Sequence, residues 1–207
     1  MKKKPKSLIF SYCYIYGGSE KLMLLIIKNK IIREHYQIIF AFGSHKIYDE
    51  AINEDYSEEE KKNILFPFPI ASNAPFFYKI NLLSIPLTIK KIIKIPFYII
   101  DKLGFYFIFN FLTQIYVLLK FSPDIVHINN GGYPGASSCS TMVFAARFMR
   151  IRHIVYQINN ATFKTKNPII KYFDRFINRY VSCFITASEN SKEKLVDDRM
   201  FDSNKII

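Results

Sequence analysis

The sequence predicts an α/β domain, a Rossmann-like parallel sheet flanked by helices, and three observations carry this prediction. Short apolar runs alternate along the chain with segments of helical periodicity, the pattern of a parallel sheet wrapped by helices. Glycine or proline lies at the ends of several of these runs. Half of the 207 residues are hydrophobic, which is enough for one substantial core, so we expect residues 1–207 to form a single domain.

The first apolar run is interpreted as a buried strand and not as a secretory signal. It follows basic residues, as a signal would, but it is short, rich in tyrosine and interrupted by serine, and no cleavage site follows it. The other strands are apolar runs of similar length. In order, the predicted strands are Ser7–Cys13, His35–Phe42, Ile64–Phe68, Asp124–Asn129, His153–Ile158 and Cys183–Thr186, and a last one begins at Lys205-Ile206-Ile207.

Helices are expected between the strands, and capping residues mark where several of them begin. Ser19 and Ser188 can each accept a hydrogen bond from the backbone at a helix start. Asn167 combines a cap with a following proline, and Pro134 is expected as the first residue of its helix, where its missing N–H is tolerated. The acidic, polar segment Tyr48–Lys62 is expected to be a surface helix or a loop.

Residues 76–121 form an apolar, lysine-bearing insertion that interrupts this alternation. Its longest uncharged run, Leu103–Leu119, is shorter than the roughly 20 apolar residues that a membrane-spanning helix needs. On a helix, one side would carry lysines and the other isoleucines, as in a helix lying in the membrane interface with its lysines toward anionic head groups. Packing on the domain's own core and a true span are the alternatives. The lysines are Lys90, Lys91 and Lys94, and the isoleucines are Ile85, Ile89, Ile92 and Ile93.

The chain is strongly basic, with a formal net charge of +12 from 29 Lys and Arg against 17 Asp and Glu. Such an excess suits an anionic membrane face, a phosphorylated substrate or a nucleic acid. The lysines interleave with Ile and Leu instead of forming an Arg-rich groove, and no nucleic-acid-binding motif is present. No nucleic-acid partner is therefore expected.

The three cysteines predict neither a disulfide nor a metal site. Cys13, Cys139 and Cys183 are widely spaced and set in apolar runs, as free thiols in a reducing compartment are. The sequence has no CxxC pair, and its histidines do not cluster beside a cysteine. It also lacks the GxSxG signature of a hydrolase nucleophile.

Gly17-Gly18-Ser19-Glu20 lies where a parallel sheet places its ligands, beyond the carboxyl end of the first strand and at the start of a helix. Gly17 and Gly18 allow close approach of a ligand to the backbone. With Ser19 they form a candidate phosphate-binding loop at a helix N-terminus. An ordinary turn is the alternative, because the segment is neither a dinucleotide-binding fingerprint nor a P-loop.

Amide side chains gather at the end of the fourth predicted strand. Asn129 and Asn130 would reach its carboxyl end, just before a flexible turn at Gly131 and Gly132. Amide groups there can form hydrogen bonds with sugar hydroxyls. His127 falls within the strand, so a buried histidine bonded inside the core is the favoured interpretation over a ligand contact.

The same arrangement recurs at the end of the following strand, where Gln157, Asn159 and Asn160 stand. Because parallel strands end at the same edge of a sheet, both amide clusters are expected to face one crevice. This convergence predicts a binding site more strongly than either cluster does alone.

In combination, these motifs resemble the N-terminal domain of glycosyltransferase family 4, retaining enzymes built from two Rossmann-like domains in the GT-B fold. The resemblance covers nearly the whole chain and is loosest across Asp49–Phe121. It rests on Gly17-Gly18-Ser19-Glu20 after the first strand, Asp124-Ile-Val-His127 after a proline, the segment Thr186–Leu195, and the closing Lys205-Ile206-Ile207.

The resemblance implies a hexosyltransferase-type enzyme whose nucleotide-sugar donor is a substrate, with no cofactor and no metal. It implies that Gly17 and Gly18 approach the donor diphosphate or the reacting sugar, and that Asn129–Gly132 and Asn159–Asn160 line the acceptor side. The acceptor would be a lipid-linked or cell-surface glycan of cell-envelope polysaccharide biosynthesis. The high content of Ile, Lys and Asn indicates an AT-rich bacterial genome. The resemblance also implies that the basic, apolar insertion docks on the cytoplasmic leaflet, where lipid-linked acceptors reside. The expected location is therefore cytoplasmic, peripheral on the inner face of the bacterial cytoplasmic membrane.

The chain departs from this family in two ways. Many members carry a histidine near Asn159, and an amide orients a hydroxyl but does not take up a proton, so Asn159 and His127 are candidates only and the catalytic residues stay unassigned. The family's donor-binding glutamate pair belongs to its C-terminal domain, and Glu50 and Glu58 match its spacing only by chance.

We therefore expect an acceptor-binding half that is inactive alone, either truncated or completed by a separate C-terminal donor domain. The alternative function is a non-catalytic, membrane-associated binding or scaffold protein derived from such a domain.

Overall fold

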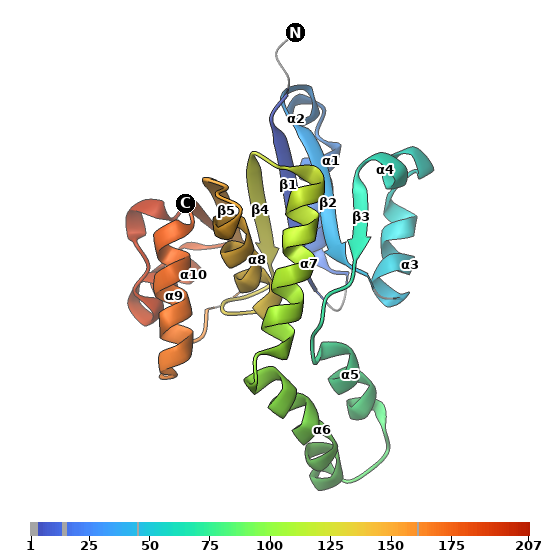
Figure 1. Cartoon of the computed structure of the whole chain (residues 1–207), viewed down its shortest axis with the longest axis vertical. Coiled ribbons are helices and arrows are strands. Elements are labelled where there is room, and N and C mark those ends of the chain that lie inside the picture. Colours follow the sequence, from blue (N-terminus) through green and yellow to red (C-terminus); the bar gives the residue numbers. More distant parts are fainter. Residues whose placement is uncertain (1–3, 14–15, 45, 161) are drawn as a thin grey trace.

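A computed structural model describes residues 4–13, 16–44, 46–160 and 162–207. In this part of the chain, a 6-stranded parallel sheet has the strand order β3-β2-β1-β4-β5-β6, with helices on both faces (Figure 1). The predicted α/β fold class is confirmed. The strands are β1 (Lys6–Ser11), β2 (Gln37–Gly43), β3 (Leu65–Phe68), β4 (Ile125–Asn130), β5 (His153–Ile158) and β6 (Cys183–Thr186).

The strand order reverses between β1 and β4, which lie side by side although they are far apart in the sequence. Ser11 of β1 pairs in register with Asn129 of β4, and Asn129 pairs with Gln157 of β5. Because the strands are parallel, the turns that follow them leave from one edge, where doubly wound sheets bind their ligands. The turns predicted to form one wall therefore do share one edge of the sheet.

Two apolar clusters fill the two faces of the sheet. Leu8 and Phe10 point to one face and Ile9 to the other, as the alternation of side chains along a strand requires. The larger cluster lies under α7 (Phe105–Phe121), α8 (Ser137–Phe148), α9 (Pro168–Tyr180) and α10 (Glu189–Arg199), and the smaller one under α1 (Gly18–Lys28), α2 (Lys30–His35) and α3 (Lys46–Asp55), with α4 (Glu58–Asn63) beside β3.

The acidic segment after β2 forms α3 and α4. Tyr48, Ile52 and Tyr56 recur at helical spacing and are all buried in the smaller cluster, whereas the glutamates point to solvent. The segment is therefore a helical layer of the domain and not a loop.

Most strand bounds agree with the prediction, and the differences lie at strand ends. β5 and β6 have the predicted bounds, whereas β1 stops at Ser11, β2 continues to Gly43 and β4 continues to Asn130. At the C-terminus, a short 3-10 turn is followed by a single parallel bridge between Phe184 and Ile206, where the beginning of a last strand was predicted.

Two of the four predicted helix starts are confirmed. Asn167 accepts a hydrogen bond from Ile169 N at 2.9 Å, and Ser188 accepts one from Ser191 N at 3.3 Å. Ser19 does not cap its helix. α1 begins one residue earlier, at Gly18, and the Ser19 hydroxyl donates to the neighbouring Glu20 instead.

Pro134 is not the first helical residue, because the side chain of Asn130 holds the loop that precedes α8. Asn130 Nδ2 donates to Pro134 O at 3.2 Å, and its Oδ1 accepts from Ala136 N at 3.3 Å. Gly135 has a φ of +58°, and a Cβ there would lie 2.0 Å from Gly132 O. The helix begins at Ser137, once this glycine turn is complete.

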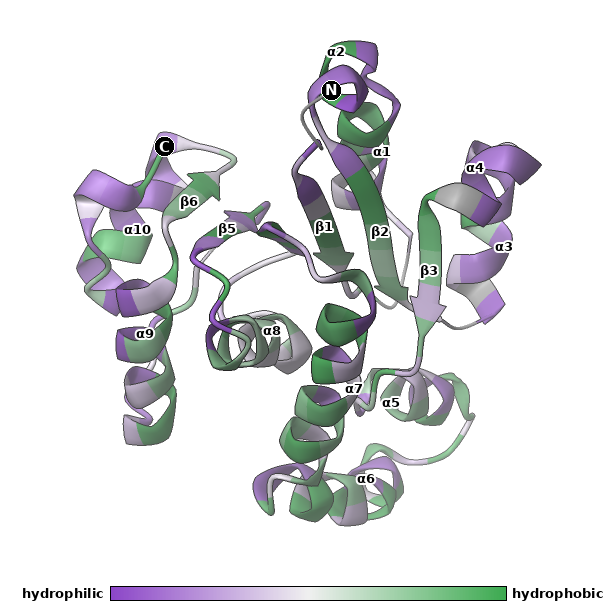
Figure 2. Cartoon of the chain, turned by 45° about the horizontal axis from the view of Figure 1, so that its top comes forward, coloured by the Kyte–Doolittle hydropathy of each residue, from purple (hydrophilic) through white to green (hydrophobic). Residues whose placement is uncertain are grey.

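The insertion forms α5 (Ala74–Leu82), α6 (Leu87–Lys102) and α7. In Figure 1, α5 and α6 extend past the carboxyl ends of the strands, and α7 returns along one face of the sheet. Figure 2 shows that hydrophobic residues predominate along these helices. Among the residues that the structure describes, no helix has the length and apolar character needed to cross a membrane.

Candidate functional site

A chain of hydrogen bonds crosses the carboxyl edge of the sheet from α1 to β5. Ser11 Oγ donates to Glu20 Oε1 at 3.0 Å, and Asn129 Nδ2 donates to Ser11 Oγ at 3.0 Å. Asn159 Nδ2 donates to Asn129 Oδ1 at 2.7 Å. Gln157 Nε2 donates to Asn159 Oδ1 at 2.8 Å. These bonds join the turns after β1, β4 and β5 into one wall, as the sequence predicts.

The Glu20 side chain holds the predicted phosphate-binding loop, residues 17–19, by hydrogen bonds. Its carboxylate is 2% exposed and accepts from Gly17 N at 3.1 Å and from Ser19 Oγ at 2.7 Å, besides Ser11. Gly17 N and the Ser19 hydroxyl are therefore already occupied by this carboxylate. Gly18 remains exposed, and a Cβ placed on it would meet nothing within 4 Å. Of the three loop residues, Gly18 offers the most open backbone to a ligand.

Asn129 and Asn130 were expected to face a ligand, but each is only 1% exposed. As consecutive residues of a strand, they point to opposite faces of the sheet. Asn129 belongs to the hydrogen-bond chain, and Asn130 Nδ2 donates to Tyr156 Oη at 2.8 Å as well as holding the loop before α8. The structure therefore places both amides inside the wall, where they fix its shape.

The exposed surface of the wall is formed by residues of the turns. Asn160 is exposed, Gly131, Gly132 and Asn159 are half-buried, and Gln157 is buried. A Cβ on Gly131 would lie 4.0 Å from Asn160 Nδ2, so the turns after β4 and β5 lie beside each other. Asn160 and the two glycines are the predicted acceptor-side residues that a ligand can reach.

His127 is bonded within the protein, in keeping with the favoured core interpretation. Its Nε2 lies 3.0 Å from Gln157 Oε1, which only accepts, so Nε2 is the donor. Burial lowers the pKa of His127, and the hydrogen bond to Gln157 offsets part of this effect. The imidazole is therefore neutral at pH 7 and is already the end of the hydrogen-bond chain.

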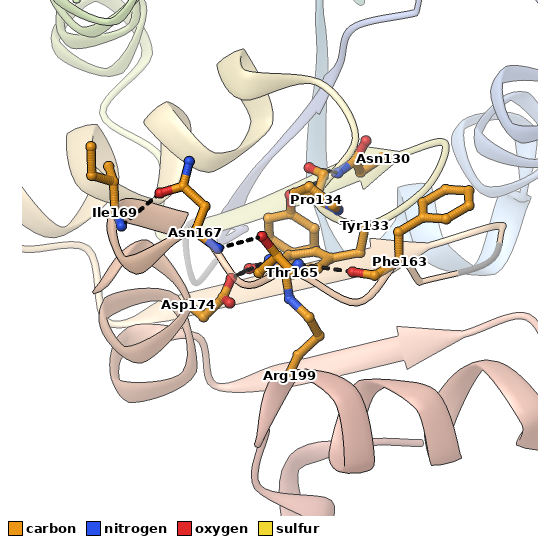
Figure 3. Close-up of polar contacts among 10 residues, drawn as sticks. Asn130, Tyr133, Pro134, Phe163, Thr165, Asn167, Ile169, Asp174 and Arg199 are labelled. Carbon is orange, nitrogen blue, oxygen red and sulfur yellow. Dashed lines mark hydrogen bonds and ion pairs between the residues drawn. The ribbon is translucent and has the colours of Figure 1, made fainter. Parts of the chain in front are cut away.

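A buried ion pair, which the sequence analysis missed, fixes the turns after β4 and β5 from behind (Figure 3). Arg199 donates from one terminal nitrogen to Asp174 Oδ1 at 2.7 Å and from the other to Phe163 O at 2.9 Å. Tyr133 donates its hydroxyl to the same Asp174 oxygen at 2.8 Å, and the guanidinium lies 4.9 Å from the centre of its ring. No local motif marks this pair, because its two charges belong to separate helices.

The predicted amphipathic helix forms as α6, but two of its three lysines face α5. Lys90 Nζ donates to Asn81 O at 2.8 Å and Lys94 Nζ to Asn81 Oδ1 at 2.7 Å, whereas Lys91 is exposed. The core-packing alternative does not hold for three of the isoleucines, which remain exposed, while membrane contact stays a prediction. Their exposed fractions are 45% for Ile89, 59% for Ile92 and 39% for Ile93.

The described residues contain no cluster of three or more His, Cys, Asp or Glu placed to hold an ion, and Cys13, Cys139 and Cys183 form no disulfide. Burial raises the pKa of Cys139 far above its usual value, so this thiol stays protonated and unreactive.

No protein-family model and no curated protein matches the chain in sequence. Solved structures do match it in fold. A glycosyltransferase from Rickettsia africae is similar over 100% of this chain and 42% of its own, with a TM-score of 0.59 and 16% identity. The chain has the fold of one GT-B half.

Two other solved structures are similar to the same extent. MurG from Acinetobacter baumannii aligns with 98% of this chain and 44% of its own, with a TM-score of 0.54 and 13% identity. A UDP-GlcNAc 2-epimerase from Neisseria meningitidis, solved bound to UDP-GlcNAc, aligns with 98% of this chain and 45% of its own, with a TM-score of 0.53 and 14% identity. This chain therefore spans less than half the length of each of these proteins.

Proposed function

We propose that this chain is the acceptor-side half of a retaining, hexosyltransferase-type GT-B glycosyltransferase. Its donor is a nucleotide-sugar, and its acceptor is a lipid-linked or cell-surface glycan of cell-envelope polysaccharide biosynthesis. The observation that carries the proposal is the single polar wall that the turns after β1, β4 and β5 form where the strand order reverses. The nucleotide-sugar proteins that share the fold support it.

Each part of the wall has a proposed task. Gly18 and the N-terminus of α1 approach the donor diphosphate, whose charge suits the positive end of a helix dipole. The Glu20 carboxylate holds the loop from beneath, so the phosphate contact comes from backbone and not from the Ser19 hydroxyl. Asn160, Gly131 and Gly132 contact the acceptor, while Asn129 and Asn130 keep the turns in place.

The wall presents no free base to a ligand, because its carboxylate, Glu20, is buried and accepts hydrogen bonds from Ser11, Gly17 and Ser19. Asn159 is an amide whose nitrogen donates to Asn129 and whose oxygen accepts from Gln157. The half-buried His127 ring lies within β4 and donates from Nε2 to Gln157. The wall therefore binds and orients, and the proton and charge chemistry depends on a donor domain. For this reason we propose that the chain is inactive alone, and that a C-terminal donor domain completes it.

The proposed location is the inner face of a bacterial cytoplasmic membrane, with the protein attached peripherally. α5 and α6 extend past the same edge of the sheet that carries the polar wall, so a surface bound by them would lie beside the acceptor side (Figure 1). Exposed isoleucines and Lys91 on α6 suit an interface of acyl chains and anionic head groups. A lipid-linked acceptor in that membrane would reach the wall without leaving the bilayer.

One observation favours the second candidate, a non-catalytic membrane-associated binding or scaffold protein. The amides of Asn129, Asn130 and Asn159 are all bonded within the protein, which makes the wall rigid without giving it reactive groups. A scaffold needs only such a rigid wall and the apolar helices.

A test uses the glycines as reporters, because the chain has only 7. With ¹⁵N-glycine labelling, we expect UDP-sugars and GDP-sugars to shift the amide signals of Gly17, Gly18, Gly131 and Gly132. Gly104, between α6 and α7, is the internal control. Binding by one half of a cleft is expected to be weak, with a Kd on the order of 1 mM. Signals that stay unmoved with every nucleotide-sugar, while vesicle binding persists, would support the scaffold instead.

A further inference from the structure

A groove between α7, α8 and α9 lies away from the polar wall. It has a volume of about 400 Å³ and is lined by Phe111, Phe144, Phe148, Phe176, Arg147 and Arg150. Arg150 follows α8 and precedes β5, so the arginine end of the groove lies toward the amino edge of the sheet, opposite the turns of the wall. Its volume falls within the range of roughly 300–1,000 Å³ typical of small-molecule sites.

The groove has an aromatic lining that is already packed. The rings of Phe144 and Phe176 stack with their centres 3.9 Å apart, and Phe111 meets Phe148 edge to face at 5.6 Å. Phe148 is nevertheless 68% exposed. A ligand that covers it removes a large apolar surface from water and reorders little of the protein.

Two arginine side chains lie at this aromatic surface, and no carboxylate neutralises their positive charges. The Arg147 guanidinium lies over the Tyr180 ring, 4.8 Å from its centre, and the residue is exposed, so its N–H donors can reach a ligand. Neither Arg147 nor Arg150 joins any ion pair formed among the described residues, and no acidic residue lines the groove. An anion that reaches this end of the groove would meet two unneutralised guanidinium groups.

We propose that this groove binds a lipid phosphate, with its apolar chain along the phenylalanines and its phosphate on Arg147 and Arg150. A phosphate group fits the forked donors of two arginines, and an apolar chain fits the phenylalanine lining. The site is separate from the acceptor side of the wall, and it stands whether or not the protein transfers a sugar.

The experiment measures binding of dodecyl phosphate below its micelle concentration by isothermal titration calorimetry. Dodecanol tests the need for the anion, inorganic phosphate tests the need for the chain, and dodecanoate tests phosphate against carboxylate. We expect saturable one-to-one binding of dodecyl phosphate, and affinities at least about tenfold lower for the other three probes.

Variants locate the site. The double variant R147Q/R150Q is expected to weaken dodecyl phosphate binding at least about tenfold. R179Q is the matched control, because Arg179 also packs on Tyr180, at 5.4 Å, but does not line the groove. F148W gives a second readout, since the chain has no tryptophan and the new indole would report directly on the groove. Thermal melts of each variant separate lost binding from lost folding.

Several results would overturn the proposal. Equal affinities of R147Q/R150Q and R179Q would show that the arginines do not bind the phosphate. Equal affinities for dodecanol and dodecyl phosphate would show that the groove is an apolar surface with no site for a phosphate. Light scattering that finds a dimer, together with an F148W emission that depends on protein concentration, would assign the groove to a second copy of the chain. None of these results depends on the glycine signals that test nucleotide-sugar binding.

Discussion

The carboxyl edge of the sheet and the helical insertion differ in which side chains they bury. The edge buries polar side chains, and the insertion exposes apolar ones. At the edge, polar side chains are buried and bonded to one another, from Glu20 through Asn129 to Gln157. In the insertion, apolar side chains along α6 and α7 are exposed to solvent, among them Ile92 and Leu112. The polar groups of the first region are bonded within the chain, whereas many apolar groups of the second remain exposed.

This contrast separates polar groups that are bonded within the chain from apolar groups that are left exposed. A buried amide without a bond costs about 1–3 kcal/mol, so a fully bonded wall has essentially one low-energy arrangement. An exposed isoleucine costs the isolated domain little but favours any apolar surface that covers it. Substitutions at the edge should therefore lower the stability of the domain. Substitutions in the insertion should instead change its association with other surfaces.

The largest effect is expected from Arg199→Ala, which leaves the buried carboxylate of Asp174 without its cation. The side chains of the pair are 0% and 5% exposed, so the charge that remains is poorly hydrated. We expect the free energy of unfolding to fall by about 3–5 kcal/mol in urea titrations. Arg175→Ala, an exposed arginine on α9, is the matched control and should change it by less than about 0.5 kcal/mol. A loss below 1 kcal/mol for Arg199→Ala would mean that the pair does not hold the turns.

The next effect concerns the wall itself. Asn129→Ala removes the link between Ser11 and Asn159 and should lower the free energy of unfolding by about 1–3 kcal/mol, because both neighbours keep buried polar atoms. Asn160→Ala alters an exposed residue of the next turn and should leave stability within about 0.5 kcal/mol of the parent. Urea denaturation of the two variants checks this. Similar losses for both would show that the turns, and not the hydrogen-bond chain, carry the stability.

The sheet and its shared edge were predictable because they depend on local patterns. Short apolar runs gave the bounds of β5 and β6, and parallel strands necessarily end at one edge. Asn167 and Ser188 acted as caps because a helix start needs only nearby atoms. These features require no knowledge of distant residues.

The exposure of the site residues was not predictable in the same way. Asn129 and Asn130 lie at a strand end as expected, but whether an amide faces a ligand depends on partners 118 residues away at Ser11 and 26 away at Tyr156. The sequence did not indicate that Arg199 and Asp174 form a buried pair. The sequence of α10 is polar, so no hydrophobic periodicity marks which of its charged residues is buried. Long-range bonding decided which polar residues were structural.

A smaller effect follows from the titration of His127. Burial lowers its pKa below the usual 6.5, so the protonated form favours the unfolded chain. The stability that the neutral ring confers is complete above pH 6.5, is lost as the pH falls from there toward the folded pKa, and changes no further below it. The slope in this window is at most about 1.4 kcal/mol per pH unit.

His127→Gln provides the measurement, because its side chain does not titrate in this range. Unfolding free energies of the parent and this variant, taken between pH 5 and pH 7.5, should converge as the pH falls. Glu60, whose pKa is lowered chiefly by its backbone hydrogen bond with Ser57, acts below pH 4.5 and outside this window. Parallel curves would show that His127 is hydrated and not part of the bonded edge.

The smallest effect on stability, and the largest on association, is expected from charges placed in the insertion. Ile92→Glu on α6 introduces a carboxylate at a residue that is 59% exposed, so the free energy of unfolding should change by less than about 0.5 kcal/mol. Binding to vesicles that contain anionic lipid should nevertheless fall several-fold, since the glutamate opposes both the acyl chains and the head-group charge. Leu25→Glu is the matched control, because Leu25 is 68% exposed on α1, on the other face of the sheet.

Flotation of the parent and both variants at low and high salt completes this test. The lysines of the insertion predict that the parent's binding weakens as salt screens the anionic surface. Salt-independent binding would assign the attachment to the apolar residues alone. If Ile92→Glu floats as well as the parent while Leu25→Glu does not, the membrane-facing surface lies over α1, and the contrast between a closed polar edge and an open apolar insertion fails.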